Sequence, residues 1–448
     1  MDECTDHDTT TDILLNSKYD MLNEMVEEIH TRSVRIPKDE IKIVNKYFQE
    51  VIHVFTKQMK EVDDTFKKIF RKILYTGSFF EGLKISSADE YDLNVIINPE
   101  LKMKPVRKKK YAPAGHIAIE VIKDQNCEIK PYKDWLHHEK ESNRYFLKID
   151  QVKSWLQGIV IKARDKIVEE KLIKDFKLDI RQSGPAWTLI FKDQNRKVSI
   201  DLVPCLEFPN KDWPGIPRKP EKILNGKDND PWFAVPKSPR IPPEDLKKNK
   251  LWFLAWRLSF PIQEKNIIND LNYLKFILRL LKQVRDQLKI HAVASYYIKT
   301  LFLWEIETQK DQTMWKKTSR GRLFMYMLIR FQEALEAGHI DFFWDKECNL
   351  VDHVAAEYLT INANQIKKFV KKVEGFIDKG DKDELRKFLM SKLCPSVEVP
   401  VAQNVGKPSV NQSVAQNGKK ASENRPPVVK LSENVQQVNS VFGSCIIL

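Results

Sequence analysis

The segment GSFFEGLKISSADEYDLNV, residues 77–95, combines a Gly-Ser turn (Gly77 and Ser78) with two acidic residues, Glu90 and Asp92. The segment and its flanks predict a strand, the turn, a short helix and a second strand. Residues two apart on a strand project from the same face, so these carboxylates repel each other unless a cation or proton lies between them. Mg²⁺ with a nucleoside triphosphate satisfies such a pair, and the Gly-Ser turn offers N–H groups and a hydroxyl to phosphate oxygens.

Asp201 supplies a third carboxylate, in the apolar segment VSIDLV. A carboxylate between apolar neighbours usually has a specific partner. If its strand lies beside the strand of Asp92, the three carboxylates of Glu90, Asp92 and Asp201 (the carboxylate triad) can hold two divalent ions, Mg²⁺ or Mn²⁺. One ion lowers the pKa of an attacking hydroxyl, and the other neutralises charge on a leaving pyrophosphate. The alternative is that Glu90 and Asp92 decorate a turn and Asp201 pairs with an arginine.

The composition describes a globular and basic protein. The chain has 448 residues, 42% of them hydrophobic, which excludes a wholly disordered chain. It has 75 Lys and Arg against 62 Asp and Glu, and the net charge of +13 favours polyanionic partners such as nucleic acid, nucleotides or acidic lipid. The six cysteines lack zinc-site spacing, no apolar run reaches about 20 residues, and the polar N-terminus is unlike a signal peptide. We therefore expect a cytoplasmic protein.

Hydrophobic periodicity divides the chain into four parts. A long helix is predicted from about Pro37 to Met59, mixed helix and strand follow, and the pattern becomes mainly helical after about residue 250. The final residues are rich in Val, Asn, Gln, Ser and Pro and cannot form a core. The predicted parts are a disordered N-terminus (1–12), a catalytic lobe with the long N-terminal helix (13–250), a helical C-terminal lobe (251–394) and a flexible tail (395–448).

The Gly-Ser turn, the Glu-x-Asp pair and the distal Asp201 resemble the polymerase-β-like nucleotidyltransferase superfamily. In more detail, segment 77–95 is similar to cyclic GMP-AMP synthase and the cyclic GMP-AMP synthase-like receptors of animals. Further segments resemble this family in the same order: SGPAWTLIF (183–191), VSIDLVPCLE (198–207), DWPG (212–215), PWFAVPK (231–237), WRLSF (256–260) and ASYYIKTLFLW (294–304). The resemblance covers roughly residues 38–390. It implies an α+β, bilobed fold with a mixed-sheet catalytic lobe, a helical C-terminal lobe and an active site in the cleft.

The resemblance also implies roles for individual residues. The carboxylate triad would be catalytic and would bind the two metal ions. Arg257 and Ser259 would hydrogen-bond a base edge, and an Arg fork suits guanine. The remaining nucleotide-binding residues would be Gly77, Ser78, Lys275 and Ser295 at the triphosphate, and Tyr296 stacked on a base. In the alternative view, Tyr296 is a core residue of an apolar helix and Arg257 forms a structural ion pair.

The sequence departs from the vertebrate DNA-sensing enzyme at two places. Residues 259–275 contain no Cys or His, so the zinc-binding insertion of that enzyme is missing and no zinc is expected. This resembles the insect receptors, for which the family's known ligand is double-stranded RNA. Val203 stands where the vertebrate enzyme has a hydroxyl-bearing residue, which leaves the base preference and the phosphodiester linkage open.

Basic residues on a helix predicted at 151–174 form the candidate nucleic-acid-binding surface. Lys and Arg on one helix face match phosphate spacing, and A-form RNA is recognised by shape. The candidates are Lys153, Lys162, Arg164, Lys166 and Lys171, with Lys247, Lys248 and Lys250 of PEDLKKNK. The alternative is a solvated charged face, because Glu169 and Glu170 interrupt the run. A second candidate is the cluster Lys102, Lys104, Arg107 and Lys110, which is alternatively only a loop.

The resemblance favours nucleic-acid-activated synthesis of a cyclic dinucleotide, cyclic GMP-AMP, from ATP and GTP. It implies an innate immune sensor whose product acts on a STING-type receptor. One alternative is an oligoadenylate-synthetase-like nucleotidyltransferase, against which WRLSF and SYYIKT argue. The other is a catalytically silent relative that binds nucleic acid or a partner, against which the intact triad and Ser78 argue.

The sequence Cys445-Ile446-Ile447-Leu448 fits the Cys-aliphatic-aliphatic-X pattern, and the terminal Leu favours geranylgeranylation. One prenyl chain alone anchors weakly, and the segment before it carries few basic residues. We therefore expect partial or reversible membrane tethering. The alternative is an unmodified thiol at Cys445.

Overall fold

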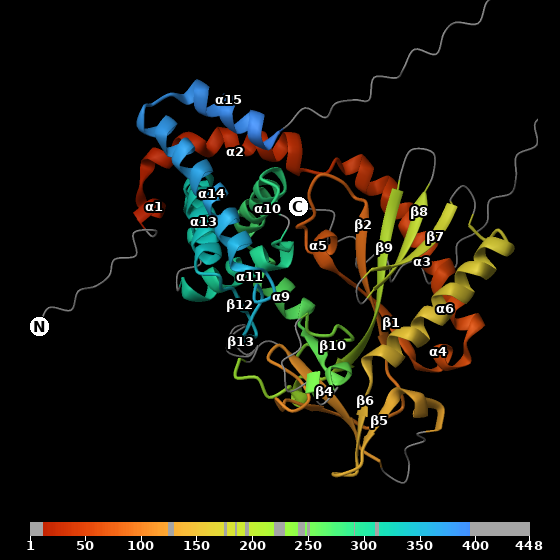
Figure 1. Ribbon diagram of the computed structural model, residues 1–448. Coiled ribbons are helices and arrows are strands. Elements are labelled where there is room, and N and C mark those ends of the chain that lie inside the picture. The colour runs from red at the N-terminus through yellow and green to blue at the C-terminus, as the bar shows by residue number, and fades with distance from the viewer. Residues whose placement is uncertain are drawn as a thin grey trace, which may run out of the picture. The chain divides into compact units, whose positions relative to one another are not determined.

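The structure is a computed structural model. It describes residues 12–123, 130–173, 177–183, 186–192, 197–218, 229–240, 247–248, 251–290, 292–309 and 313–394. Met1–Cys394 and Pro395–Leu448 are separate units, and everything below concerns the first of them (Figure 1). Cys445 and Lys250, both singled out in the sequence, lie outside the described residues.

A large mixed sheet forms the first lobe. Within the described residues it has eleven strands in the order β1-β2-β9-β10-β11-β4-β6-β5, with β3 beside β4, and with β8 between β9 and β7. Strands β2 and β9 are parallel, whereas β1 pairs with β2 in the antiparallel direction. The bounds are β1 (Phe70–Thr76), β2 (Glu90–Ile97), β3 (Met103–Val106), β4 (His116–Val121), β5 (Leu136–Glu139), β6 (Arg144–Leu147), β7 (Lys177–Ser183), β8 (Ala186–Lys192), β9 (Lys197–Phe208), β10 (Trp232–Val235) and β11 (Trp256–Ser259).

The strand, Gly-Ser turn, short helix and strand predicted around the acidic pair are confirmed. They are β1, α5 (Gly77–Phe80) and β2. Strand β2 buries five of its last six residues completely or nearly so, because it lies inside the sheet between β1 and β9. Its first residue, Glu90, is exposed at the strand end. The acidic end of β2 therefore reaches the surface where the turn is.

Two long helices cover this lobe and pack on each other, α3 (Lys38–Val62) and α6 (Ile149–Glu169). The long helix predicted from about Pro37 is confirmed, and its buried stripe includes Val44, Phe48, Ile52 and Phe55. Ile43, an apolar residue of the same helix, is 39% exposed. Helix α6 ends five residues before the predicted position 174, and Lys171 then adopts a positive φ of 51°. Shorter helical segments here are α4 (Asp64–Ile69), η3 (Lys130–Trp135), η4 (Asn210–Asp212) and η5 (Trp252–Leu254).

The second lobe is helical, as the sequence predicts. It contains α9 (Pro261–Ile268), α10 (Asn272–Gln287), α11 (Ser295–Thr308), α12 (Met314–Lys317), α13 (Arg320–Glu336), α14 (Ala356–Asp378) and α15 (Lys382–Leu393). This lobe also contains a small antiparallel hairpin, formed by β12 (Asp341–Phe342) and β13 (Asp345–Asn349). The bilobed α+β fold expected from the resemblance is confirmed. Across the described residues, we find no helix that is long and apolar enough to span a membrane.

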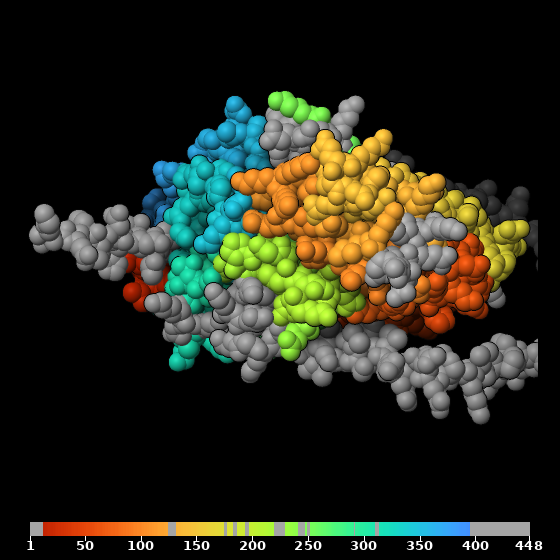
Figure 2. All heavy atoms as spheres, turned by 90° about the horizontal axis from the view of Figure 1, so that it is seen from below, coloured from red at the N-terminus to blue at the C-terminus, as the bar shows by residue number. Residues whose placement is uncertain are grey.

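Asp345 joins the two lobes. Its carboxylate accepts hydrogen bonds from Arg107 at 2.9 Å and from the backbone N–H of Gly115 at 2.8 Å. Figure 2 shows a side of the molecule on which orange residues of the sheet lobe adjoin cyan residues of the helical lobe. Arg107, part of the second basic cluster named above, is therefore a structural contact between lobes.

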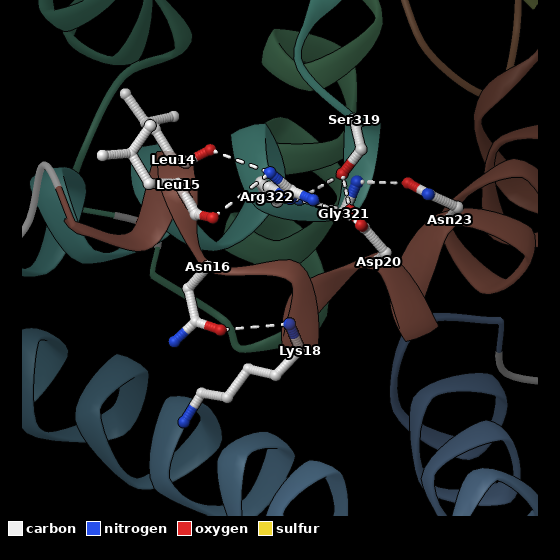
Figure 3. Close-up of polar contacts among 9 residues, drawn as sticks. All are labelled: Leu14, Leu15, Asn16, Lys18, Asp20, Asn23, Ser319, Gly321 and Arg322. Carbon is white, nitrogen blue, oxygen red and sulfur yellow. Dashed lines mark hydrogen bonds and ion pairs between the residues drawn. The ribbon is translucent and has the colours of Figure 1, made fainter.

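The N-terminal segment packs on the helical lobe, although it precedes the sheet in the chain. It consists of α1 (Asp12–Leu15), η1 (Ser17–Leu22), α2 (Asn23–Ile29) and the π-helix η2 (His30–Val34). Asp20 accepts two hydrogen bonds from Arg322, with Nε at 2.8 Å, and Asn23 accepts one from the N–H of Gly321 at 2.8 Å (Figure 3). A Cβ at Gly321 would lie 2.2 Å from the carbonyl oxygen of Tyr19, so only glycine allows this approach.

Candidate active site

Asp92 and Asp201 lie opposite each other on neighbouring parallel strands. The pairing of β2 with β9 aligns Asp92 with Asp201 and Glu90 with Ser199. Because side chains alternate along a strand, Glu90 and Asp92 share one face of the sheet. Thr188 of β8 donates a hydrogen bond to Oδ1 of Asp201 at 2.5 Å and fixes that carboxylate from the other side. The structure thus brings Asp92 and Asp201 together at one end of β2 and β9.

The Gly-Ser turn closes over Asp92. Gly77 has a φ of +79°, in the left-handed region that favours glycine. A Cβ at this position would lie 1.8 Å from Oδ2 of Asp92, so a side chain here would displace the carboxylate. The turn and the acidic pair are therefore one packed unit, and the glycine is required for both conformation and space.

Burial and mutual repulsion shift the two central carboxylates toward the protonated form. Burial, and then the charges of Glu90 and Asp201, raise the pKa of Asp92 to about 7. Burial also raises the pKa of Asp201, opposed by the hydrogen bond from Thr188, and Glu90 raises it further. A cation between these carboxylates would relieve the repulsion and return them to the charged form.

Lys84 already neutralises part of this charge. Its ammonium lies 2.9 Å from Glu90 and 3.1 Å from Asp89, and its side chain is only 14% exposed. Among the described residues, no group of three or more His, Cys, Asp and Glu side chains is arranged to hold a metal ion. The oxygen donors of the carboxylate triad suit Mg²⁺ or Mn²⁺. In the present arrangement, Oε2 of Glu90 accepts a hydrogen bond from Lys84 at 2.9 Å.

Two of the residues expected at the nucleobase, Arg257 and Tyr296, lie close to each other. Arg257 of β11 lies with its guanidinium 5.8 Å from the ring centres of both Tyr296 and Phe342. Within the described part of the chain, Arg257 forms no ion pair. The Tyr296 hydroxyl donates to Glu264 at 2.8 Å, and burial, followed by the charge of Glu264, raises the pKa of the hydroxyl well above its ordinary value. Its ring is thus held in place from the hydroxyl end.

Two of the residues expected at the triphosphate lie on α10 and α11. Ser295 begins α11, where its hydroxyl accepts a hydrogen bond from Arg285 at 2.6 Å. Lys275 lies on the first turn of α10 and is half-buried. Arg285 carries no role in the sequence-based expectations, because its contact with Ser295 depends on how α10 and α11 pack.

The sequence matches known proteins along most of its length. Residues 79–270 match the Mab-21 protein nucleotidyltransferase domain, and residues 273–368 match the Mab-21 protein HhH/H2TH-like domain. A cyclic GMP-AMP synthase-like receptor of Aethina tumida is 31% identical over 387 residues, which cover 84% of this chain and 93% of that protein. The chain belongs to the family of cyclic GMP-AMP synthase-like receptors. Receptors of the same description from Ctenocephalides felis and Tribolium castaneum are 28% and 29% identical, over 84% and 79% of this chain and 89% of each relative.

In this member of the cyclic GMP-AMP synthase-like receptor family, a buried charge network lies beside the candidate site. This network was not predicted from the sequence. The ammonium of Lys299 lies 2.8 Å from a carboxylate oxygen of Glu81 and 2.8 Å from one of Glu264. The three side chains are 7%, 9% and 5% exposed, respectively. A signal was present, because Lys299 is the one cation inside the apolar segment YYIKTLFLW, and a lysine there needs a buried partner.

The basic residues predicted to bind nucleic acid have different environments. Lys166 pairs with Glu61 at 2.8 Å, and Arg164 pairs with its neighbour Asp165 at 2.5 Å. Burial lowers the pKa of Lys153, and Lys162 is exposed. Lys247 and Lys248 are exposed in the short described stretch at 247–248. The charges of α6 are thus partly neutralised within the protein.

Proposed function

We propose that the chain is a nucleic-acid-activated synthase that joins ATP and GTP into a cyclic dinucleotide, cyclic GMP-AMP. The single observation that carries the proposal is the alignment of Asp92 with Asp201 on parallel strands, with Gly77 packed on the Asp92 carboxylate. The names of the relatives support the same chemistry. Nucleotidyltransferases of this class use divalent metal ions and nucleotide substrates.

The chain's own residues divide the work between phosphate and base. Ser78, Lys275 and Ser295 would bind the triphosphate, with the N–H groups of the Gly-Ser turn. Arg257 and Ser259 would read a base edge while Tyr296 stacks on the ring. Two divalent ions held by the carboxylate triad would supply activation of the attacking hydroxyl and charge neutralisation at the pyrophosphate. Glu90 would join the triad after exchanging its contact with Lys84.

The proposed activator is double-stranded RNA, bound along α6. Its exposed Lys162 and the partly exposed Arg164 and Lys166 suit a phosphate backbone and need no base reading. The ion pairs of Arg164 and Lys166 would have to exchange carboxylates for phosphates, so binding should depend strongly on salt. The product would signal through a STING-type receptor, which makes the protein an innate immune sensor.

One observation favours a second candidate, a catalytically silent relative. Lys84 forms an ion pair with Glu90. Among the described residues, no group of three or more His, Cys, Asp and Glu side chains is arranged to hold a metal ion. Such a protein would bind nucleic acid or a partner without turnover. An oligoadenylate-synthetase-like activity is the other alternative, and it would leave linear 2′-5′ or 3′-5′ products instead of cyclic ones.

The proposed location is the cytoplasm, with a prenyl group on Cys445 as a reversible membrane tether. Cys445 lies outside the described residues, so this part of the proposal rests on the sequence pattern alone. Fractionation of cells that express wild-type protein or Cys445→Ser tests it. Release of the variant from membranes supports the tether, and identical partitioning of the two proteins contradicts it.

Incubation with ATP, GTP, Mg²⁺ or Mn²⁺ and either long double-stranded RNA or DNA tests the proposed activity. Mass spectrometry of the products distinguishes all three candidates. The proposal requires a cyclic dinucleotide that depends on nucleic acid. Linear oligoadenylates favour the oligoadenylate-synthetase-like activity. An absence of product with retained nucleic-acid binding favours the silent relative.

A further inference from the structure

The buried network around Lys299 joins three segments that are distant in the sequence. Glu81 follows α5 directly, Glu264 belongs to α9, and Lys299 belongs to α11. Lys299 is within 2.9 Å of both oxygens of Glu81 and within 2.8 Å of Glu264. An ammonium has three N–H donors, so these contacts use its full capacity. We call Lys299, Glu81 and Glu264 the lysine bridge.

One end of the lysine bridge holds the Gly-Ser turn. The backbone N–H of Glu81 donates to the carbonyl of Gly77 at 3.2 Å, which closes the single turn of α5. Fixing the Glu81 carboxylate therefore fixes the C-terminal end of α5. Because Gly77 has no room to move toward Asp92, this contact also sets where the phosphate-binding turn lies against the carboxylate triad.

The other end of the lysine bridge holds the base side of the site. Oε1 of Glu264 accepts hydrogen bonds from the Tyr296 hydroxyl at 2.8 Å and from Trp344 Nε1 at 3.1 Å, while its other oxygen contacts Lys299. The guanidinium of Arg257 lies 5.8 Å from the Tyr296 ring. Displacement of Glu264 would therefore move the residues that are expected to contact the nucleobase.

We propose that Lys299 is a positioning residue that fixes the separation between the phosphate-binding Gly-Ser turn and the base-contacting Tyr296. Lys299 acts through Glu81 and Glu264 and does not itself touch substrate. The inference rests on the proposed nucleotide-binding function of this site. One buried ammonium would thereby fix the distance between the groups that bind the phosphates and the group that contacts the base. A single contact within either lobe could not fix that distance.

The charge balance of the bridge explains why a simple deletion is a poor test. Removing Lys299 leaves two uncompensated buried carboxylates, which destabilises the fold regardless of any role in catalysis. Replacing Glu81 and Glu264 by Gln at the same time removes those charges and keeps acceptors for Tyr296 and Trp344. The neutral triple variant Lys299→Met, Glu81→Gln, Glu264→Gln therefore separates folding from positioning.

Glu305 offers a matched control on the same helix. It is 5% exposed and accepts hydrogen bonds from the Tyr326 hydroxyl at 2.6 Å and from Arg330 at 2.9 Å. Its contacts stay within the helical lobe and do not reach the Gly-Ser turn or Tyr296. Glu305→Gln should lower the melting temperature and leave the kinetic constants for nucleotide unchanged.

The experiment compares full-length wild type, the triple variant and Glu305→Gln in three measurements. These are melting temperature, its increase on adding Mg²⁺ and ATP without activator, and kcat/KM for dinucleotide synthesis with double-stranded RNA. We expect the triple variant to melt near the wild-type temperature, to lose the ATP-induced increase, and to lose on the order of a hundredfold in kcat/KM. Wild-type kcat/KM and ATP response in a folded triple variant would overturn the inference.

Failure of the proposed function has a different signature. If wild-type protein makes no product with any activator, the proposed synthase activity is wrong. The ATP-induced increase in melting temperature then decides the inference alone. Its loss in the triple variant and retention in Glu305→Gln support positioning, and any other pattern of the two contradicts it.

Discussion

Asp92 and Asp201 face each other across neighbouring parallel strands, 109 residues apart in the chain and directly paired in the sheet. Thr188 fixes one carboxylate, and the Gly-Ser turn covers the other. This relationship places two acids that repel each other at the end of a buried sheet. Such an arrangement is costly for folding, and it is the basis on which we propose a cation-dependent site here.

Asp201→Asn should abolish product formation. Asp201 is a proposed ligand of the metal ions, so we expect its loss to lower kcat roughly a thousandfold, corresponding to several kcal/mol of charge stabilisation. Asp179→Asn, on the exposed edge strand β7, is the matched control and should retain activity. Product yield within a few-fold of wild type from Asp201→Asn would refute the catalytic role.

Without divalent cations, the protein should lose stability as the pH rises toward neutrality. Asp92 has its pKa raised from 3.8 to about 7, so the folded state binds more protons than the unfolded state between these values. The contribution is on the order of 4 kcal/mol, fully present below the lower value and lost as pH rises through the upper. Urea unfolding in EDTA across this range should show the decline, and Asp92→Asn should flatten it. Equal pH dependence in both proteins would contradict the assignment.

Gly77→Ala should damage the site far more than Gly82→Ala. Both glycines have positive φ, +79° and +73°, so both substitutions carry left-handed strain of about 1 kcal/mol or more. Only at Gly77 would the new Cβ meet Asp92, whereas nothing lies within 4 Å at Gly82. We expect loss of activity and a lower melting temperature for Gly77→Ala, with Gly82→Ala retaining most activity. Similar kinetics for both variants would show that the contact with Asp92 is unimportant.

Charge reversal on α6 should weaken RNA binding. Lys162→Glu with Arg164→Glu removes two candidate phosphate contacts, so the affinity should fall and its dependence on salt should become less steep. Lys379→Glu, an exposed residue at the end of α14, provides a control with charge reversal on the helical lobe. Filter binding at several salt concentrations measures both effects. If the affinity of the α6 variant depends on salt as steeply as that of wild type, the RNA-binding surface lies elsewhere.

The local pattern of the site could be predicted because it depends on neighbours in sequence. The Gly-Ser turn, the strand after it and the shared face of Glu90 and Asp92 follow from turn chemistry and strand alternation. The pairing of Asp92 with Asp201 required a parallel alignment of β2 and β9, and periodicity alone does not choose a strand's partner. The resemblance to a known family supplied that step.

Contacts that depend on tertiary packing could not be predicted from the sequence. Lys84 meets Glu90 only because the loop between α5 and β2 folds back, and Lys299 meets Glu81 across 218 residues. The early end of α6 was not predicted either: Lys171, two residues after the helix, has a positive φ, and hydrophobic periodicity does not indicate backbone conformation of that kind. Buried charges in apolar segments were visible in the sequence, but their partners were not.

The most direct test of the account compares products of wild type and Asp201→Asn. Each protein is incubated with ATP, GTP, Mn²⁺ or Mg²⁺ and long double-stranded RNA, and the nucleotides are separated and identified by mass spectrometry. We expect a cyclic dinucleotide containing one adenosine and one guanosine from wild type only, and only when nucleic acid is present. Absence of that product from wild type, or its formation by Asp201→Asn, would contradict the account.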